Sequence, residues 1–585
     1  MANMPVVPTT SPFSRAGRRA RHLMSAVMPT REEVEALLTG PGAMFEVTTE
    51  EVRGIPMKVY ATRFGSLREV TAMGQSRGTQ EYVVYGDRRY GFAEFVALAN
   101  SVSRHLTAEA GVGHGDRVAV LSANNPEWAL AFWGTVDLGA IVVGLNGWWK
   151  NDEILYGLED SGSKVLVADR ARFARIADAD LGSVERVYLI DADPSEFPQC
   201  ANIHRFDDLL ADPTPDLPTT PIDEDDPAVI FYTSGTTGRP KGAISTHRSM
   251  IANLQNTVYL AASSAMADPA PLVGDGPAAQ TASLLTSPMF HVSGCHSGIV
   301  VGMLAGVKLV VPVGKFDPLV AMQLIQDERI SVWATVPTMV WRVVEHPDQA
   351  AYDLTSITSV ATGGSPAAGE LQRQIKVTFP SVRSVGNAYG LTESSSVATV
   401  IAGEDFTLRP TSVGRAMPVV DIRIVDGEVW IKGPIIMPGY WGKPEATAES
   451  IVDGWLRTGD VGYVDDEGFL YITDRAKDMI IRGGENIYCV EIESRLVEHP
   501  AILDAAVIGV PHPTLGEEVK AVVEIDPDTS LTAEEIQAWV AETLANFKVP
   551  AYIEMTTEKL PRNASGKLLK NVLRGEGEVS FAETM

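Results

Sequence analysis

Cysteine is scarce in this sequence. Cys200, Cys295 and Cys489 are its three cysteines, and they are far apart in a chain of 585 residues. They show no metal-ligand spacing. A few widely separated cysteines are typical of proteins in a reducing compartment. We therefore expect a cytoplasmic protein.

Long apolar runs and an excess of positive charge are also missing. The most apolar stretch, residues 298–313, is interrupted by Lys308 and by glycine and proline, so it is too short to span a bilayer. The formal net charge is −27 and the pI is about 4.8, which argues against nucleic acid and anionic membranes as partners. Hydrophobic residues make up 45% of the chain. A chain of 585 residues is too long to fold around a single hydrophobic core. We expect at least two domains.

A secretory signal is absent as well. Residues 1–30 contain Arg15, Arg18, Arg19 and Arg21 without an apolar signal core. We expect a flexible N-terminal extension over residues 1–30, and a basic targeting segment is the alternative.

Two common nucleotide-binding patterns are missing. There is no Gly-x-Gly-x-x-Gly, and Lys241 is not in a Walker loop because it stands between Pro240 and Gly242. The chain has instead the stretch YTSGTTGRPKG at residues 232–242, between two segments that predict strands. Its glycines leave backbone amides unobstructed, and its hydroxyls and lysine complete the donors of a phosphate-binding loop. The candidate residues are Thr233, Ser234, Gly235, Thr236, Thr237, Gly238 and Lys241. An ordinary Gly/Ser/Thr surface loop is the alternative.

The sequence before this loop alternates between strands and helices. Apolar positions at 95, 98, 102 and 106 predict a helix that stops near Gly111. Residues 117–121 and 140–143 predict strands on either side of a helix at 126–138, and further strands are expected at 165–168 and 187–190. This alternation predicts an α/β fold of parallel or mixed sheets with flanking helices.

The loop resembles the phosphate-loop signature of the adenylate-forming superfamily, which includes acyl-CoA synthetases and peptide-synthetase adenylation domains. Further stretches match that family's motifs in the same order, at 287–294, 360–366, 387–393, 455–460, 475–486 and 561–568. The resemblance covers nearly all of residues 90–570. It implies a large N-terminal domain at 31–475 and a small mobile α+β domain at 476–585, with a hinge near Lys477. Within the small domain we expect helices at 490–496 and 532–544, the second with a Thr532–Glu535 capping box, and strands at 505–510 and 519–523.

The resemblance also implies a role for each motif. Tyr389 would give adenine an aromatic face, Thr392 would give the α-phosphate a hydroxyl, and Glu393 would give Mg²⁺ a carboxylate. Asp460 would accept the ribose hydroxyls, and Lys567 would bridge the substrate carboxylate and the α-phosphate. The other residues implied in binding nucleotide or coenzyme A, or in the hinge, are Gly364, Ser365, Pro366, Asn387, Gly390, Arg475, Lys477, Gly483 and Gly484.

The segment at 287–294 bears on the acid that is activated. His291 matches a family position that lines the acyl pocket, where enzymes for α-amino acids usually have aspartate, so an amino-acid substrate is disfavoured. A structural histidine is the alternative. The candidate pocket residues, mostly small or apolar, are Val292, Cys295, His296, Val336, Gly364 and the run Ser394, Ser395 and Ser396.

Together these features predict an ATP-dependent carboxylic acid–CoA ligase that forms acyl-AMP and then acyl-CoA. Its small molecules would be ATP, Mg²⁺, coenzyme A and a fatty or other hydrophobic acid. The alternatives are an acyl-AMP ligase that serves a carrier protein, a luciferase-like oxygenase and a nonenzymatic nucleotide-binding member of the superfamily. The family often forms dimers, so a homodimer is an open expectation, and which acid is bound is left open.

Overall fold

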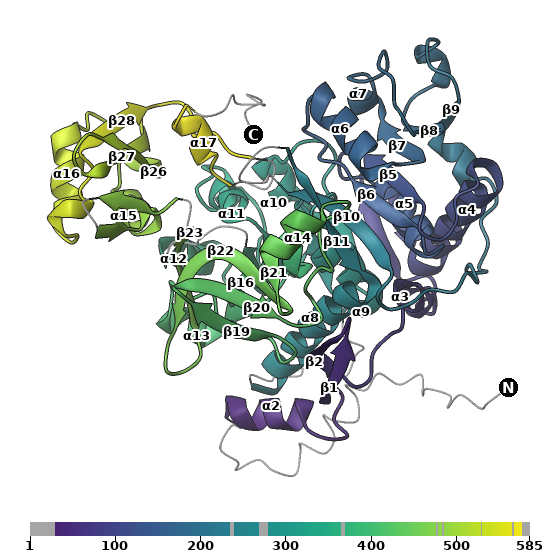
Figure 1. The fold of residues 1–585 in the computed structure, drawn as a ribbon, viewed down its shortest axis with the longest axis horizontal. Helices are drawn as coiled ribbons and strands as arrows, with labels where there is room; N and C mark the ends of the chain where they lie inside the picture. Colours follow the sequence, from purple (N-terminus) through teal and green to yellow (C-terminus); the bar gives the residue numbers. More distant parts are fainter. Residues whose placement is uncertain are drawn as a thin grey trace.

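The computed structural model describes residues 30–233, 239–267, 279–363, 369–475, 478–482, 485–527, 529–563 and 567–575. Figure 1 shows a large domain built from several sheets and helices, and a small domain at one end that contains the strands and helices nearest the C-terminus. The helix α17 (Lys570–Leu573) lies between the two. The predicted combination of a large α/β domain and a small α+β domain is confirmed.

One layer of the large domain is a seven-stranded sheet in the order β11-β10-β6-β5-β7-β8-β9. The six strands from β10 onward are parallel, and β11 pairs antiparallel with β10. The strands are β5 (Arg117–Leu121), β6 (Ile141–Gly144), β7 (Val165–Asp169), β8 (Arg186–Ile190), β9 (Ile203–Arg205), β10 (Pro227–Thr233) and β11 (Lys241–Thr246). The predicted strands and their parallel arrangement are therefore confirmed.

Helices pack on this sheet through continuous apolar surfaces. The helix α5 (Pro126–Val136) has every residue buried, and α4 (Phe92–Ala110) ends where Gly111 takes a left-handed conformation at φ 59°. That conformation favours glycine because it has no Cβ. The remaining helices of this half are α6 (Asn151–Ser161) and the short α7 (Arg170–Phe173).

The second layer is a nine-stranded sheet in the order β18-β17-β16-β15-β14-β12-β13-β3-β4. Its six central strands, β16 to β3, are parallel. The strands are β3 (Glu81–Tyr85), β4 (Arg88–Gly91), β12 (Ala282–Leu284), β13 (Lys308–Val311), β14 (Val332–Thr335), β15 (Ser359–Gly363), β16 (Ser384–Tyr389), β17 (Thr399–Ala402) and β18 (Arg415–Ala416).

The two faces of the nine-stranded sheet are covered differently. One face packs against α10 (Pro318–Asp327), α11 (Pro337–Val344) and α12 (Gly369–Thr378) in a core that includes Trp333, Val360 and Val385. The other face lies beneath α3 (Leu67–Gln75), α8 (His247–Ala267), α9 (Val301–Ala305) and the π-helix η4 (Cys295–Val300). This second face is the one that holds the site described below.

Smaller sheets complete the molecule. The hairpin of β1 (Val47–Val52) and β2 (Ile55–Tyr60) follows α2 (Arg31–Thr39). A five-stranded antiparallel sheet contains β19 (Asp421–Val425), β20 (Glu428–Lys432), β21 (Ile451–Val452), β22 (Trp455–Val464) and β23 (Leu470–Arg475). The helix α13 (Gly403–Leu408) precedes this sheet in the chain, and α14 (Pro444–Ser450) stands between its strands β20 and β21.

The small domain has its own sheet and core. Its strands are β24 (Ile480–Arg482), β25 (Glu485–Ile487), β26 (Ile502–His512), β27 (Gly516–Ile525) and β28 (Tyr552–Thr556), and its helices are α15 (Cys489–Val497) and α16 (Ala533–Ala541). The predicted capping box is confirmed, because Thr532 accepts from the Glu535 amide and Glu535 accepts from the Thr532 amide. The exact domain bounds near residues 30 and 475 stay a prediction. Among the described helices, none combines the length and the apolar character that a membrane crossing requires.

Candidate active site

A cavity of about 1,030 Å³ lies between the nine-stranded sheet, α8 and η4, and residues near the C-terminus also line it. Its lining includes nine of the residues predicted from motifs, which come from positions between 233 and 567: Thr233, Lys241, His291, Asn387, Tyr389, Gly390, Thr392, Glu393 and Lys567. Motifs that are far apart in the sequence therefore meet at one place.

The floor of the cavity is a sheet face with small side chains. Alternate residues of a strand share a face, and Ser359, Ala361 and Gly363 of β15 line the cavity, as does Thr362. On β16, Ser384 and Gly386 do the same. The intervening Val360 and Val385 are buried in the core on the other face. Small residues on one face and large ones on the other leave room above the sheet for a ligand. Because a strand rises about 3.3 Å per residue, the floor is roughly 13 Å long from Ser359 to Gly363.

The wall opposite the floor is helical. From α8 the cavity is lined by Asn256, Thr257, Leu260, Ala261 and Ser264, which recur at the spacing of one helix face. From the region of η4 it is lined by Ser297, Gly298, Val301 and Gly302. None of the predicted motifs includes these helical positions. For the floor, the alternation of small and large residues along β15 and β16 is a sequence signal that could have predicted it.

One end of the cavity is formed by a tight turn after β16, which carries two of the predicted catalytic residues. Thr392 and Glu393 lie in the 3-10 turn η6 (Thr392–Ser394), and the Leu391 amide donates to Ser394 Oγ at 2.9 Å. The Tyr440 hydroxyl donates to Glu393 Oε1 at 2.9 Å, and Lys241 Nζ lies 5.2 Å from the centre of the Tyr440 ring. Tyr440 therefore connects the end of the phosphate loop to the carboxylate expected to bind metal.

Lys567 reaches this cavity from the small domain. Its amide donates to Asn563 Oδ1 at 2.9 Å, and the Asn563 amide donates back to the Lys567 carbonyl at 2.8 Å. These two bonds hold the backbone of Lys567 against Asn563. Arg562, Asn563 and Leu569 line the cavity beside it. The small domain thus contributes directly to the same cavity as the motifs of the large domain.

Two sheets meet at the end of the cavity where the nucleotide is expected to bind. The Tyr389 hydroxyl at the end of β16 donates to Asp460 Oδ2 in β22 at 2.6 Å. Asp460 is 3% exposed and pairs across the strands with Arg475 of β23, whose side chain lies outside the described atoms. The neighbours of Asp460 that line the cavity are Thr458 and Gly459.

The flanks of the phosphate loop are held by residues that the motif analysis missed. The Tyr232 hydroxyl donates to Asp160 Oδ2 at 3.0 Å, and Lys443 Nζ forms a 2.6 Å ion pair with Asp160 Oδ1. On the other side of the loop, the Tyr156 hydroxyl donates to the Pro240 carbonyl at 3.1 Å. Since Asp160 lies in α6, no local sequence signal connects it to the loop.

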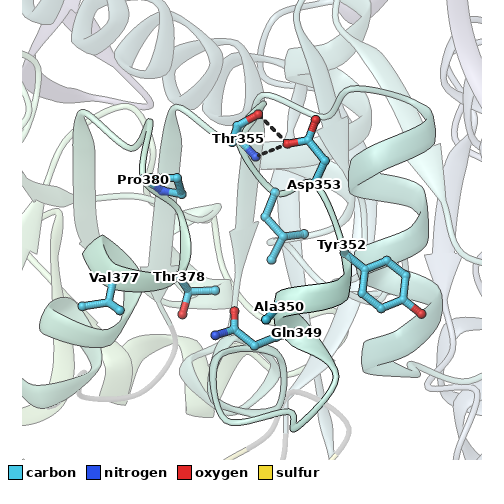
Figure 2. A pocket seen from close by; sticks show the side chains of 9 residues that line it. Gln349, Ala350, Tyr352, Asp353, Thr355, Val377, Thr378 and Pro380 are labelled. Carbon is cyan, nitrogen blue, oxygen red and sulfur yellow. Dashed lines mark hydrogen bonds between the residues drawn. The ribbon is translucent and has the colours of Figure 1, made fainter.

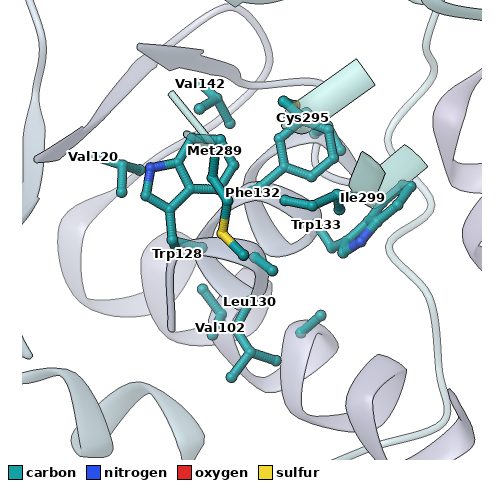
Figure 3. Packing of buried hydrophobic residues seen from close by; sticks show 14 of the residues in the cluster. Val102, Val120, Trp128, Leu130, Phe132, Trp133, Val142, Met289, Cys295 and Ile299 are labelled. Atoms are coloured by element: carbon teal, nitrogen blue, oxygen red, sulfur yellow. The ribbon is translucent and has the colours of Figure 1, made fainter. Parts of the chain in front are cut away.

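His291 lines the cavity, as expected, but two of its neighbours do not. Burial lowers the pKa of His291 to about 4, so the ring is neutral at pH 7, and its Nδ1 lies 3.2 Å from Ser293 Oγ. The prediction that Cys295 and His296 line the pocket is wrong. Cys295 packs in the core among Trp128, Phe132, Trp133 and Met289 (Figure 3), and His296 is fully buried with its ring 5.5 Å from that of Phe231.

The serine run also needs a correction. Ser396 lines the cavity, and its Oγ lies 2.8 Å from Ser297 Oγ. Ser394 and Ser395 are buried instead, and the Ser395 hydroxyl donates to Ser249 Oγ at 2.9 Å. The chain takes a positive φ of 50° at Ser395, within the turn that carries these serines. Val292 and Val336 line the cavity, as expected.

Some predicted residues lie outside the part of the chain that the structure describes. They are Ser234, Gly235, Thr236, Thr237, Gly238, Gly364, Ser365, Pro366, Lys477, Gly483 and Gly484.

The donor set fits a magnesium ion that also binds substrate phosphates. Within the described residues, no group of three or more His, Cys, Asp or Glu side chains could hold a metal alone. Mg²⁺ in nucleotide sites usually takes one or two carboxylates together with phosphate oxygens and water. Glu393 lines the cavity and can supply such a carboxylate.

A second, smaller hollow lies elsewhere on the large domain. It has a volume of about 260 Å³, and Figure 2 shows the side chains that line it, among them Ala350, Asp353 and Thr355. The Thr355 amide and hydroxyl both donate to Asp353, which closes a local turn. None of the motif residues is in this hollow, so we assign the chemistry to the larger cavity.

Comparison with known proteins agrees with this geometry. Residues 71–441 match the AMP-binding enzyme family, and residues 491–567 match the AMP-binding enzyme C-terminal domain. The 3-[(3aS,4S,7aS)-7a-methyl-1,5-dioxo-octahydro-1H-inden-4-yl]propanoyl:CoA ligase of Rhodococcus jostii is 36% identical over 84% of this chain and 95% of its own. A long-chain-fatty-acid–CoA ligase of Mycobacterium tuberculosis is 35% identical over 83% of this chain and 93% of its own.

A solved structure shows the same architecture. The o-succinylbenzoate CoA synthetase from Bacillus subtilis, in complex with the acyl-adenylate intermediate, superposes with a TM-score of 0.72 and 29% identity, covering 88% of this chain and 98% of that one. The match extends over both domains. The chain therefore belongs to the family of AMP-binding enzymes, within which it is an AMP-forming acid–CoA ligase.

Proposed function

We propose that this ligase activates a hydrophobic carboxylic acid at the cavity described above, through acyl-AMP, and transfers the acyl group to coenzyme A. The observation that carries the proposal is the convergence of Thr392, Glu393 and Lys567 on a cavity with a deep floor of small residues. The polar end suits reacting anions, and the floor suits an apolar acyl group.

The nucleotide is proposed to bind at the Tyr389 end. Asn387 is 6% exposed, and its Oδ1 has no hydrogen-bond partner among the described residues. A buried acceptor of this kind can receive the exocyclic amine of adenine, and Tyr389 can pack against the ring. Asp460 is proposed to accept the ribose hydroxyls, because its carboxylate is held beside the cavity by Tyr389.

The first half-reaction joins two anions, so the enzyme must supply positive charge and alignment. The acid's carboxylate attacks the α-phosphorus, the bond to the bridging oxygen breaks, and pyrophosphate leaves. Lys567 is proposed to bridge the carboxylate and the α-phosphate, and Thr392 is proposed to donate to the α-phosphate. A magnesium ion held by Glu393 would neutralise phosphate charge. His291 is neutral at pH 7 and is proposed to border the carboxylate without adding charge.

The second half-reaction requires the lysine to leave. We propose that the small domain rotates about Lys477, withdrawing Lys567 and bringing the Gly483–Gly484 segment toward the acyl-AMP. The thiol of coenzyme A then attacks the acyl carbonyl, and AMP departs. The support is topological, because the chain passes from the large domain to the small one between β23 and β24.

The acid is proposed to be fatty, aryl or alicyclic. The relatives described above are named for a bicyclic propanoic acid, for long-chain fatty acids and for o-succinylbenzoate, so family membership does not choose among these classes. The cavity floor, roughly 13 Å long, can hold any of them. An apolar pocket discriminates weakly, by about 1–3 kcal/mol per methylene, so a broad chain-length preference is expected.

The test is release of AMP and pyrophosphate from ATP and Mg²⁺ with medium-chain, long-chain, aryl and alicyclic acids, each with and without coenzyme A. We expect AMP release that depends on coenzyme A for one class of acid. Pyrophosphate formation without that dependence would favour a carrier protein as acceptor. No turnover with any acid would overturn the proposal and favour a nonenzymatic nucleotide-binding protein.

A further inference from the structure

Three serines form a polar row at one end of the cavity floor. Ser283 of β12, Ser359 of β15 and Ser384 of β16 all line the cavity. Ser359 pairs directly with Ser384 across the two strands. Val332 of β14, which also lines the cavity, pairs with Ser283 on one side and with Ser359 on the other. The three serines therefore lie at one level of the sheet.

The hydroxyls of this serine row are on the cavity face and can be reached. The residues that follow the three serines are buried in the core on the opposite face, namely Leu284, Val360 and Val385. Successive side chains of a strand point to opposite faces, so the serine side chains point toward the cavity. Each of the three serines is partly exposed. A ligand in the cavity can therefore contact them.

Between the serine row and the catalytic motifs the floor is wide and smooth. One row of paired residues crosses β14, β15, β16 and β17, and all of its members line the cavity: Ala334, Ala361, Gly386 and Ala402. No side chain in this row is larger than a methyl group. Adjacent strands are about 4.8 Å apart, so the row is roughly 14 Å wide. Ala334 is exposed although β14 is the central strand of the sheet.

This shape suits a flat body better than a single alkyl chain. Carbon atoms in contact lie about 3.5–4.0 Å apart, so one alkyl chain covers about one strand spacing. It would leave most of the floor without contacts, and the dispersion energy of those contacts would be lost. A fused ring system spreads over neighbouring strands and contacts more of the floor.

The serine row adds a chemical requirement. A hydrocarbon end placed against it would remove water from the hydroxyls and give them no new hydrogen bond, which is unfavourable. Among the described residues, none of the cavity-lining side chains from β12, β14, β15 and β16 is charged. A second carboxylate at this place would therefore lack a counter-charge on the floor. A neutral oxygen has neither problem, because a serine hydroxyl can donate to it or accept from it.

We infer that the acid of this enzyme has a flat, fused-ring body that lies on the floor, with a ketone or hydroxyl at the end farthest from its carboxylate, where it hydrogen-bonds to Ser359 and Ser384. The inference rests on the proposed function, since it concerns the acid in the same cavity. The length of the floor, roughly 13 Å, separates this oxygen from the catalytic motifs.

The experiment uses pairs of fused alicyclic acids with two, three and four rings. The members of a pair differ only in a ketone on the ring carbon farthest from the carboxylate, and decanoic and palmitic acids are the alkyl references. The readout is kcat/KM for AMP release in the presence of coenzyme A. At least one ketone acid should exceed both alkyl acids by about tenfold or more, because it makes more contacts with the floor. It should exceed its own hydrocarbon partner by about 2- to 10-fold, the range for one neutral hydrogen bond.

A double variant separates the hydroxyls from the shape of the floor. Ser359→Ala combined with Ser384→Ala should bring the ratio between the ketone acid and its hydrocarbon partner close to 1. The hydrocarbon acid should still be used as well as by the wild type, which also shows that the variant is folded. Thr257→Val is the matched control: it lines the same cavity, but its hydroxyl already donates to the Asn253 carbonyl at 3.1 Å, so the ratio should not change.

Three results would overturn the inference and leave the proposed function intact. The first is that an alkyl acid is used at least as well as every fused-ring acid. The second is equal use of both members in every pair, and the third is a ketone preference that survives in the double serine variant. No AMP release from any acid would overturn the proposed function and this inference together.

Discussion

The hydroxyl of Tyr389 donates a 2.6 Å hydrogen bond to the carboxylate of Asp460. Tyr389 ends a strand of the nine-stranded sheet, and Asp460 belongs to the five-stranded antiparallel sheet. One hydrogen bond therefore connects the residue proposed to face adenine with the residue proposed to accept the ribose hydroxyls. It also holds the carboxylate in one orientation before the nucleotide binds.

Tyr389→Phe removes that hydrogen bond and keeps the ring. Hydrogen bonds to charged groups contribute about 1.5–3 kcal/mol, and about 1.4 kcal/mol is a factor of ten in binding. We expect the KM for ATP to rise about tenfold and kcat to change much less. ATP-dependent pyrophosphate exchange measures both values. The KM for the acid should stay constant, and an unchanged KM for ATP would show that Asp460 does not depend on Tyr389.

Lys567→Ala should separate the two half-reactions. Removing one donor to a transition-state charge usually costs about 10²–10³ in rate, so we expect acyl-AMP formation to slow by at least that factor. Thioester formation from supplied acyl-AMP should survive. The control is Lys559→Ala, an exposed lysine in the same domain that does not line the cavity. Equal losses in both half-reactions would remove Lys567 from its proposed role.

Lys477→Pro tests the rotation of the small domain. Proline fixes its own φ and restricts the residue before it, so it limits the dihedral changes available at a hinge. We expect adenylation to continue and thioester formation to be abolished. Single-turnover assays of each half-reaction make the comparison, and full overall turnover in this variant would contradict the proposed rotation.

Much of the fold could be predicted because its signals are local. The hairpin around the phosphate loop, the strand–helix–strand unit at 117–144 and the capping box at Thr532 each follow from residues close together in sequence. The capping box of Thr30 and Glu33, which begins α2, is the same kind of local signal, and it lies at the predicted boundary between the extension over residues 1–30 and the large domain.

The parts that could not be predicted depend on distant contacts. The hydrogen bond from Tyr440 to Glu393 spans 47 residues, and that from Tyr232 to Asp160 spans 72 residues. Closeness to His291 in sequence predicts that Cys295 and His296 line the pocket, and this prediction is wrong. The π-helix that begins at Cys295 turns both side chains into the protein and presents Ser297 and Gly298 to the cavity instead.

Ala361→Leu should shorten the cavity. Ala361 lies in the middle of the floor, and a leucine there adds apolar bulk where the acyl group is proposed to lie. Overpacking of this kind typically costs about 1–3 kcal/mol, so we expect kcat/KM for a long-chain or bicyclic acid to fall about 5- to 100-fold. Butyric acid should be affected much less. The control is Ala350→Leu, which places the same side chain at the smaller hollow shown in Figure 2 and should leave acid preference unchanged.

His296→Phe should stabilise the protein more at pH 5 than at pH 8. His296 is fully buried, and neither ring nitrogen has a hydrogen-bond partner among the described residues. Burial, with a smaller contribution from His291, lowers the pKa of His296 from its usual 6.5 to about 3. Below about pH 6.5 the unfolded chain therefore binds a proton that the folded protein does not, and the free energy of unfolding falls as the pH is lowered toward 3.

In the His296→Phe variant the unfolded chain no longer binds this proton, and an aromatic ring still packs against Phe231. One pH unit corresponds to about 1.36 kcal/mol per proton. The difference in free energy of unfolding between variant and wild type should therefore be roughly 2 kcal/mol larger at pH 5 than at pH 8. Asp137, whose pKa burial raises to about 7, gives the opposite pH dependence, but it is present in both proteins and cancels in their difference. Urea unfolding of both proteins at the two pH values makes the measurement. An equal stability difference at pH 5 and pH 8 would mean that His296 is protonated, or hydrated, inside the folded protein.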